Sequence, residues 1–542
     1  MRAVALGAAV EHVETAKRIT NRTDLEKRLT GRFYTPQLIA ERIAAQAINV
    51  CPEPESVCDP FCGDGRLVVA WLRTAARGSS LRRLRRVVLW DYDAEAVRRA
   101  RGCVSAELSL LGLSSKVTLT AEAGDTFART PTMLARVDAV LTNPPWELLK
   151  PDSRDGVDDE GDYKGQLRGY ASTLAKDFPG AMSAKGKAMT GYGVNLARAG
   201  AVASAMLTSA RGVVSIVLPS SIFADQASGP FRREFFSRLG VTQLDWYPAE
   251  ARLFDGVDQP FVTATAIAGT ATSSFMLTRY GKDLDVVEHR DTALGTDASK
   301  PVALNVAGEH EALVASLAST HAALSLLEAD MRFGLWLGRE LDETRLAESL
   351  VEAGSGVPFL KGRHVFPFQV VRDEPLHIDP AKRQIPSTVK ELRLAWRDVS
   401  RPNQRRRMHV ALVPEGNVTG NSLGVAFFRY GPLDRVRVLM AIMNSMAFEL
   451  QVRTHLATAH VSQGVLRRCS VPLRCFDDAP LKERLLTLVD SRLTSGEEMP
   501  ELEVAVARAY GIARDEFASM LGAFPKLTAA ERAAHLRSEL WS

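Results

Sequence analysis

The feature that most restricts the fold of this chain is the alternation of strand-like and helix-like segments in its first 290 residues. Short apolar runs end in glycine or acidic residues, and stretches with a helical period follow them. The segments are ESVCDPFCGDGRLVVAWLRTAA (55–76), RRVVLWDYDAEAVRRARGCV (85–104), KVTLTAEAGDTF (116–127), VDAVLTNPPW (137–146), NLARAGAVASAMLTSA (195–210) and GVVSIVLPSSIF (212–223). Strands that alternate with helices predict an α/β fold with a parallel, doubly wound, Rossmann-like sheet.

Four regions are expected along the chain. The alternating region spans residues 1–290, a helical connector 291–330, a second, mixed α/β domain 331–478 and a helical tail 479–542. Within the first region, RFYTPQLIAERIAAQAI predicts a turn into a helix, with Thr35 as N-cap and Pro36 as the first helical residue. The polar stretch between Trp146 and Gly193 has no clear period and is predicted to form a mobile loop or lid.

Composition excludes several classes of protein. No apolar run reaches the roughly 18 residues of a membrane span, and Glu11 and Glu14 interrupt the N-terminal apolar patch too early for a signal peptide. The 6 cysteines form no CxxC pair, so we expect neither a disulfide framework nor a bound metal. We therefore expect a reduced, cytoplasmic protein with no membrane partner.

The glycine loop in DPFCGDG points to a nucleotide-type cofactor. Gly63 and Gly65 let the backbone approach a ligand, and the next helix offers free N–H groups at its start. However, Asp59 and Asp64 would repel a pyrophosphate. They suit a cationic ligand without phosphates, such as S-adenosylmethionine, which carries an ammonium, a sulfonium and an adenosine.

Acidic residues also end the next two strands of the predicted sheet. Asp91 can bind ribose hydroxyls, and Asp125 can accept a hydrogen bond from the adenine amine of the cofactor. A plain turn would explain the glycine loop alone. The two further carboxylates at successive strand ends favour a cofactor site.

The run VLTNPPW ends a predicted buried strand on an unusual group of residues. Pro144 and Pro145 stiffen the backbone and supply no N–H. The Asn143 side-chain oxygen and the Pro144 carbonyl then form a pair of acceptors suited to an –NH2 group. Accepting both hydrogens of an exocyclic amine exposes its lone pair to an electrophilic methyl group, and Trp146 offers a face on which a flipped base can stack. The simpler alternative is a proline turn capped by a core tryptophan.

The chain resembles the DNA methyltransferases that modify the N6 amino group of adenine, in the class whose cofactor motifs precede a C-terminal target-recognition domain. The matching pieces, in that family's order, are RFYTP, DPFCGDG, LWDYD, AGDTF, TNPPW, VLPSSIF and LFDGV. The resemblance implies that Asn143, Pro144, Pro145 and Trp146 hold the target amine and that Phe254 stacks on the other face of the base. It further implies a binding site for S-adenosylmethionine formed by Tyr34, Thr35, Pro36, Asp59, Phe61, Gly63, Gly65, Asp91, Asp125 and Asn143.

The second domain resembles the target-recognition domains of restriction–modification methyltransferases. The similar segments are FLKGRHVFPF, WRDVSRPNQRRRMHVALVPEGNVTGNSL and IMNSMAFELQVR with VSQGVLRRCSVP. Basic density peaks between residues 392 and 410, as a phosphate backbone would require, although a solvated surface run is an equal alternative. The candidates for contact with double-stranded DNA are Arg363, Arg397, Arg405, Arg406, Arg407 and Asn421.

The resemblance thus predicts adenine-N6 methylation of a specific DNA duplex, within a restriction–modification or related phage-defence system. About thirty residues precede RFYTP, so we expect modification without cleavage and any nuclease on a separate chain. Two alternatives stay open. The same chemistry could act on RNA or on protein glutamine, or the chain could be a DNA-specificity subunit with an inactive catalytic fold.

Overall fold

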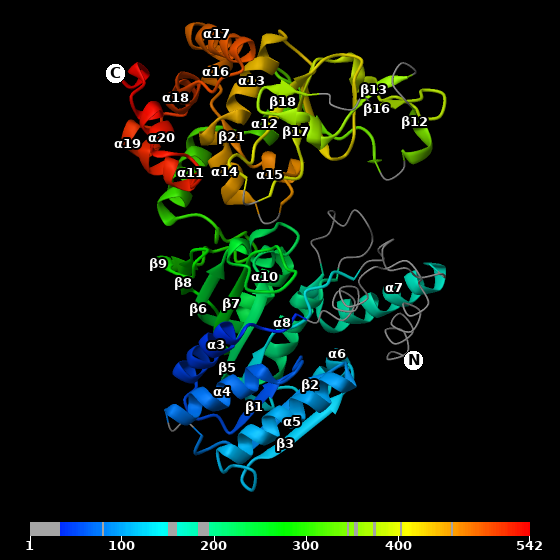
Figure 1. Ribbon diagram of the computed structural model, residues 1–542, viewed down its shortest axis with the longest axis vertical. Coiled ribbons are helices and arrows are strands. Elements are labelled where there is room, and N and C mark those ends of the chain that lie inside the picture. Colours follow the sequence, from blue (N-terminus) through cyan, green and yellow to red (C-terminus); the bar gives the residue numbers. More distant parts are fainter. Residues whose placement is uncertain are drawn as a thin grey trace. The chain divides into compact units, whose positions relative to one another are not determined.

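A computed structural model describes most of the chain and divides it into two compact units, with the boundary between Leu304 and Asn305. Each unit is treated by itself (Figure 1). The described residues are 33–78, 81–149, 160–182, 194–343, 346–351, 356–371, 376–401, 404–456 and 459–542.

The first unit is built on one nine-stranded sheet with the strand order β3-β2-β1-β4-β5-β7-β6-β8-β9. The strands are β1 (Ser56–Asp59), β2 (Arg86–Asp91), β3 (Thr118–Ala123), β4 (Val137–Thr142), β5 (Thr208–Pro219), β6 (Leu239–Tyr247), β7 (Phe261–Ala268), β8 (Ser274–Tyr280) and β9 (Val286–Ala293). The first five strands in this order run parallel, and β7 is antiparallel to both of its neighbours. The predicted doubly wound α/β fold is confirmed.

Helices cover both faces of this sheet (Figure 1). They are α3 (Gln37–Val50), α4 (Arg66–Arg77), α5 (Ala94–Leu110), α6 (Thr126–Arg129), α7 (Glu160–Asp177), α8 (Leu196–Leu207), α9 (Ser221–Ala224) and α10 (Gly229–Arg238). Apolar residues of α3, α4 and α5 share one core with β1, β2 and β4, and those of α8 and α10 share another with β5, β6 and β7. Among the described residues, no helix is both long and apolar enough to cross a bilayer.

Two local predictions differ from the structure. Helix α3 begins one residue later than expected, with Pro36 rather than Thr35 at the N-cap and no side-chain cap. The stretch predicted as a loop between Trp146 and Gly193 contains helix α7, because Leu174 and nearby apolar residues bury against the α8–α10 core. The other parts of that stretch, residues 150–159 and 183–193, lie outside the described residues.

The strand order creates a switch point between β1 and β4. From β1 the chain winds outward to β2 and β3, and then returns to the other side of β1 to form β4 and β5. The carboxyl ends of parallel strands diverge at such a point and leave a crevice that binds ligands. Asp59 ends β1, Asp91 ends β2 and Thr142 ends β4, so the predicted cofactor and target-amine residues meet at this edge.

The second unit combines small sheets with a helical layer. Its four-stranded sheets have the orders β11-β20-β17-β18 and β12-β16-β13-β19, and the pairs β10-β21 and β14-β15 complete it. The strands are β10 (Ala322–Ala323), β11 (Leu335–Gly338), β12 (Leu350–Val351), β13 (Val357–Leu360), β14 (Val365–Phe366), β15 (Gln369–Val370), β16 (Leu376–Ile378), β17 (Arg393–Arg397), β18 (Val410–Val413), β19 (Val418–Thr419), β20 (Leu423–Phe428) and β21 (Ser470–Val471). The helices are α11 (Gly308–Thr320), α12 (Leu324–Ala329), α13 (Asp434–Asn444), α14 (Met446–His455), α15 (Gln463–Leu466), α16 (Arg474–Asp477), α17 (Ala479–Ser495), α18 (Pro500–Ala509), α19 (Arg514–Met520) and α20 (Ala529–Leu536).

The expected connector and tail share the core of this unit. Val314 of α11, Val489 of α17 and Phe517 of α19 belong to the same buried cluster as Phe448 of α14 and Trp396 of β17. Amphipathic helices need an apolar partner, and here α17 packs on α13, α11 and α18 pack on α14, and α19 packs on α11 and α20. The structure therefore places one boundary near residue 304, where the sequence suggests three.

Candidate active site

The loop between β1 and α4 has the shape expected of a ligand-binding glycine loop. Gly63 and Gly65 have φ angles of +51° and +82°, in the region that favours glycine. A Cβ atom on Gly65 would lie 3.0 Å from the Cα of Ala100 in α5, so the loop can pack against that helix only with glycine. Above the loop, a Cβ on Gly63 would lie 3.2 Å from the ring of Tyr34. The backbone of the loop is thus held in a tight turn between two elements.

Carboxylates at neighbouring strand ends support this loop. Asp91 accepts hydrogen bonds from the backbone N–H of Gly63 at 2.9 Å and of Asp93 at 2.9 Å. Asp125 caps α6 through the N–H of Phe127, and the hydroxyl of Tyr170 in α7 lies 3.3 Å from both of its oxygens. Asp91 thus contacts the glycine loop directly, whereas Asp125 contacts α6 and Tyr170, which was not predicted.

Asp59 has the most unusual environment of the site. Its side chain is fully buried, and Oδ1 accepts from the Thr142 hydroxyl at 2.7 Å and from the Phe61 N–H at 3.1 Å. Oδ2 is buried and has no hydrogen-bond partner among the described residues. Burial, with smaller contributions from Asp91 and Asp64, raises the pKa of Asp59 to about 7. A buried oxygen that lacks a donor is costly, so this position fits a ligand that carries a cationic N–H group.

The segment Phe33–Pro36 lies against the glycine loop. The guanidinium of Arg66 lies over the Tyr34 ring at 4.9 Å and donates to the carbonyl of Thr35 at 3.0 Å. Arg99 of α5 donates to the Tyr34 hydroxyl at 3.2 Å. These contacts hold Tyr34 and Thr35 against α4 and α5, and a role of Tyr34, Thr35 and Pro36 in cofactor binding stays a prediction. Arg66 and Arg99 were missed because these contacts span at least 31 residues.

The orientation of the Asn143 amide is determined by its two partners. Its Nδ2 donates to the carbonyl of Phe33 at 3.1 Å, and its Oδ1 accepts from the indole N–H of Trp146 at 3.0 Å. A carbonyl can only accept and an indole N–H can only donate, so a flipped amide would lose both bonds. The Asn143 Oδ1 therefore faces an internal donor, the Trp146 indole, and its role as acceptor for a target amine stays a prediction.

The rest of the NPPW loop packs closely against neighbouring elements. A Cβ atom on Gly200 of α8 would lie 2.4 Å from the Cβ of Pro144, so the loop rests directly on the backbone of that helix. The same Cβ atom on Gly200 would lie 3.3 Å from the ring of Phe61 in the glycine loop. Gly200 was not predicted, although its place in a run of small residues, ARAGAVASA, is a signal for close approach.

Trp146 rests on an aromatic cluster. Its ring centroid lies 5.2 Å from that of Phe254 and 6.2 Å from that of Phe261. Phe254 is 5% exposed. Because the Trp146 and Phe254 rings are in contact, a base can enter between them only if one of them moves. The stacking role of both residues stays a prediction.

The predicted DNA contacts of the second unit fall into two groups. In the first group, Arg397 donates to the carbonyls of Gly362 and Val365, and burial lowers its pKa. Asn421 donates to Asp342 and accepts from the N–H of Glu343. Arg363, which neighbours Gly362, is exposed. Arg397 thus stabilises the turn that contains Arg363, whereas Asn421 stabilises the segment at Asp342 and Glu343.

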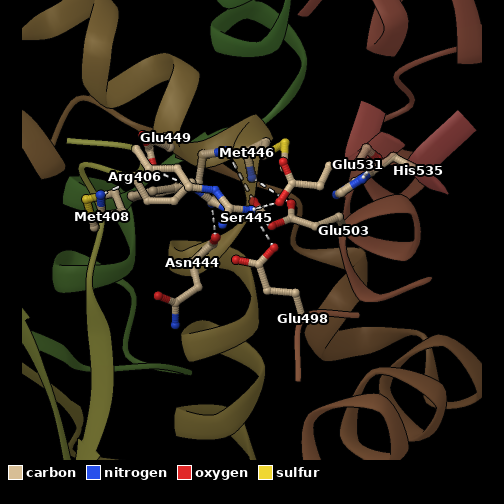
Figure 2. A network of polar contacts seen from close by, with 12 residues as sticks. Arg406, Met408, Asn444, Ser445, Met446, Glu449, Glu498, Glu503, Glu531 and His535 are labelled. Atoms are coloured by element: carbon tan, nitrogen blue, oxygen red, sulfur yellow. Dashed lines mark hydrogen bonds and ion pairs between the residues drawn. The ribbon is translucent and has the colours of Figure 1, made fainter. Parts of the chain in front are cut away.

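The second group is Arg405 to Arg407, and Arg406 belongs to a network of charges inside the unit (Figure 2). Arg406 donates to Glu449 at 2.8 Å, to Glu503 at 3.0 Å and to the carbonyl of Asn444. Glu449 is fully buried, and despite that burial the charges of Arg406 and Arg453 lower its pKa to about 2.

The two neighbouring arginines are engaged as well. Arg407 is 6% exposed and donates to the carbonyl of Ser400, and Arg405 pairs with Glu498 and Glu531. The expectation that these three arginines face DNA is corrected for Arg406 and Arg407, because their guanidinium groups are turned into the unit. The density of basic residues predicted DNA contact, but the acidic partners of this run lie up to 126 residues away in the sequence and could not be identified from it.

The strand order, the glycine loop and the carboxylates at the sheet edge define the Rossmann-like fold of S-adenosylmethionine-dependent methyltransferases. S-adenosylmethionine is the cofactor of this fold, and the unpartnered Asp59 oxygen suits its ammonium group. Residues 18–177 match the family described as N-6 DNA Methylase. The match covers less than half of the chain, and over those residues it confirms the family resemblance predicted from the sequence.

Solved structures share the fold over longer stretches. The type IIL restriction-modification enzyme MmeI, solved with DNA, is 10% identical, with a TM-score of 0.55 over 98% of this chain and 77% of that one. The DrdV–DNA complex is 11% identical, with a TM-score of 0.53 over 89% of this chain and 59% of that one. The chain also spans 65% of the type IIG restriction endonuclease BpuSI, at 14% identity and a TM-score of 0.43 over 93% of this chain. No curated protein matches the chain.

Proposed function

We propose that this chain transfers the methyl group of S-adenosylmethionine to the N6 amino group of adenine in duplex DNA. The observation that carries the proposal is the Asn143 amide, whose oxygen is presented as an acceptor at the same sheet edge as the carboxylates Asp59 and Asp91. The family match to N-6 DNA methylases supports the reaction type, and the likeness in fold to MmeI and DrdV, both solved with DNA, supports DNA as the substrate.

The residues of the first unit have separate tasks in this proposal. Asp59 holds the cationic end of the cofactor through its unpartnered oxygen. Asp91 and Asp125 stabilise the loop ends and offer oxygens toward the ribose and adenine portions. When bound, the cofactor supplies an electrophilic methyl group on a sulfonium. Phe33 and Trp146 keep the Asn143 amide oriented until the target arrives.

The target amine replaces the Trp146 indole as the donor to Asn143. The exchange substitutes one N–H donor for another at the same acceptor, so the oxygen never stays unpaired. Once its N–H is released, the indole can turn a face toward the flipped base. The acceptor then draws the amine nitrogen toward a tetrahedral geometry, which makes its lone pair available to the methyl group.

The second unit is proposed to position the duplex. Its exposed Arg363 is the candidate for a phosphate or base contact, and Arg397 and Asn421 hold the surrounding loops. We further propose that the enzyme is the modification component of a restriction–modification system or a related phage-defence system, with a restriction endonuclease as its functional partner.

The direct test is product analysis. The purified chain is incubated with duplex DNA and labelled S-adenosylmethionine, and the DNA is digested to nucleosides. We expect labelled N6-methyldeoxyadenosine. Asn143→Ala should lose this product and still bind the cofactor, because Asp59 and Asp91 are unchanged. The proposal would be contradicted if the labelled methyl group appeared in cytosine or only in RNA. It would also be contradicted if Asn143→Ala incorporated as much label as the parent protein.

A further inference from the structure

A buried hydrogen bond joins the two loops of the active site. Thr142 is the last residue of β4 and directly precedes Asn143, and Asp59 is the last residue of β1. Both side chains are fully buried, and the Thr142 hydroxyl donates to Asp59 Oδ1 at 2.7 Å. The bond therefore connects the strand end that presents the target-amine acceptor to the strand end that begins the glycine loop.

The Thr142 hydroxyl makes up half of the hydrogen-bond support of Asp59. The other donor is the N–H of Phe61, inside the glycine loop itself. The titratable groups that face Asp59 are Asp64 and Cys62 of the loop, Asp91 of β2 and Cys58 within β1. Within the part of the chain that the structure describes, none of these groups is a cation, and there the two donors are what favours the charged carboxylate against burial. They hold the pKa of Asp59 down at about 7 despite complete burial.

A role in packing alone would not need this hydroxyl. Buried strand ends are well filled by β-branched apolar side chains, and valine has nearly the same shape as threonine. Burying the hydroxyl costs free energy of desolvation, which its hydrogen bond to Asp59 offsets.

We propose that Thr142 is a positioning residue that couples cofactor binding to the orientation of the target-amine loop. Its hydroxyl keeps the Asp59 carboxylate charged and directed so that Oδ2 stays available to a cationic group, and it does so from the residue adjacent to Asn143. The inference rests on the proposed function of this site. Thr142 acts through Asp59 and Asn143 and does not itself touch the reacting atoms.

The test compares Thr142→Val, which removes the hydroxyl, with Thr142→Ser, which keeps it. S-adenosylmethionine binding to each full-length protein is measured by titration calorimetry between pH 5 and pH 9. The cofactor's own amine titrates identically with every variant, so differences in the pH midpoint belong to the protein. Losing a hydrogen bond to a charged group should move the midpoint of Thr142→Val upward by about one to two pH units. Thr142→Ser should bind as the parent does.

Kinetics and folding provide the controls. At saturating cofactor, Thr142→Val should also lower kcat for DNA, because Asn143 loses its tether to β1, and Thr142→Ser should restore it. Thr142→Ala replaces the valine variant if that protein does not fold. An unshifted midpoint in both hydroxyl-free variants, or an equal shift in Thr142→Ser, would overturn the role of Thr142. A parent protein that binds no cofactor or leaves DNA unmethylated would instead overturn the proposed function.

Discussion

Asp59 should make the folded protein less stable as the pH rises, and the size of the effect follows from its environment. Its pKa in the folded protein is about 7, against an ordinary value of 3.8. The folded state therefore binds this proton more tightly than the unfolded chain between these values. By linkage, the contribution of Asp59 to the free energy of unfolding is greatest below about pH 4. This contribution falls as the pH rises toward 7, and it does not recover above pH 7. Between pH 5 and pH 8 the free energy of unfolding falls by about 2 to 3 kcal/mol, because each pKa unit corresponds to about 1.36 kcal/mol.

The substitution Asp59→Asn isolates this contribution. The amide keeps an oxygen that can accept from Thr142 and Phe61, but it carries no titrating charge. Its –NH2 group adds a buried donor whose cost is the same at every pH. The difference in stability between Asp59→Asn and the parent should therefore be more favourable at pH 8 than at pH 5 by about 2 to 3 kcal/mol. The same variant should lose affinity for S-adenosylmethionine, since the neutral side chain no longer attracts an ammonium.

Hydrogen exchange in the full-length protein can measure this. Peptides that cover β1 and β4 report the free energy of opening of the first unit, after correction for the intrinsic exchange rate at each pH. Peptides of the second unit serve as the internal control and should not differ between the variant and the parent. An equal effect of Asp59→Asn at pH 5 and pH 8 would refute the reasoning, because it would mean that the Asp59 carboxyl does not titrate between them.

Substitutions at Trp146, Arg406 and Arg363 test the remaining assignments. Trp146→Phe keeps a stacking ring and removes the internal donor to Asn143, so this variant should bind a duplex with a flipped 2-aminopurine at least as tightly as the parent. Trp146→Ala should lose about 1–3 kcal/mol of binding free energy. Equal losses in the two variants, measured by 2-aminopurine fluorescence, would contradict the exchange of donors. Arg406→Met leaves Glu449 with less compensation and should destabilise the second unit by about 3–5 kcal/mol in thermal unfolding. The slope of log K for DNA binding against log salt concentration should be unchanged in Arg406→Met and flatter by about one unit in Arg363→Ala. The reverse pattern would mean that Arg406, and not Arg363, contacts the DNA.

Local chemistry along the chain was sufficient to predict the frame of the active site. Glycines that need positive φ angles, such as Gly63 and Gly65, occur where only a tight turn can follow a strand. A carboxylate at the end of β2 and the Asn-Pro-Pro group at the end of β4 are adjacent in sequence to the strands that carry them. Parallel strands bring these ends to one edge of the sheet, so the doubly wound fold and the shared edge of these residues follow from the pattern.

Only the tertiary structure decided which groups satisfy one another. The bond from Thr142 to Asp59 spans 83 residues, and that from Asn143 to Phe33 spans 110. The burial of Arg406 likewise depends on helices that follow it by about 40 to 100 residues. Periodicity and turn chemistry are local properties, whereas the pairing of a buried donor with an acceptor depends on the order of strands and the packing of helices. The sequence alone therefore determined which residues lie at the ends of the strands. The tertiary structure determined the hydrogen-bond partners of these residues, the charge of Asp59 and which arginines face inward.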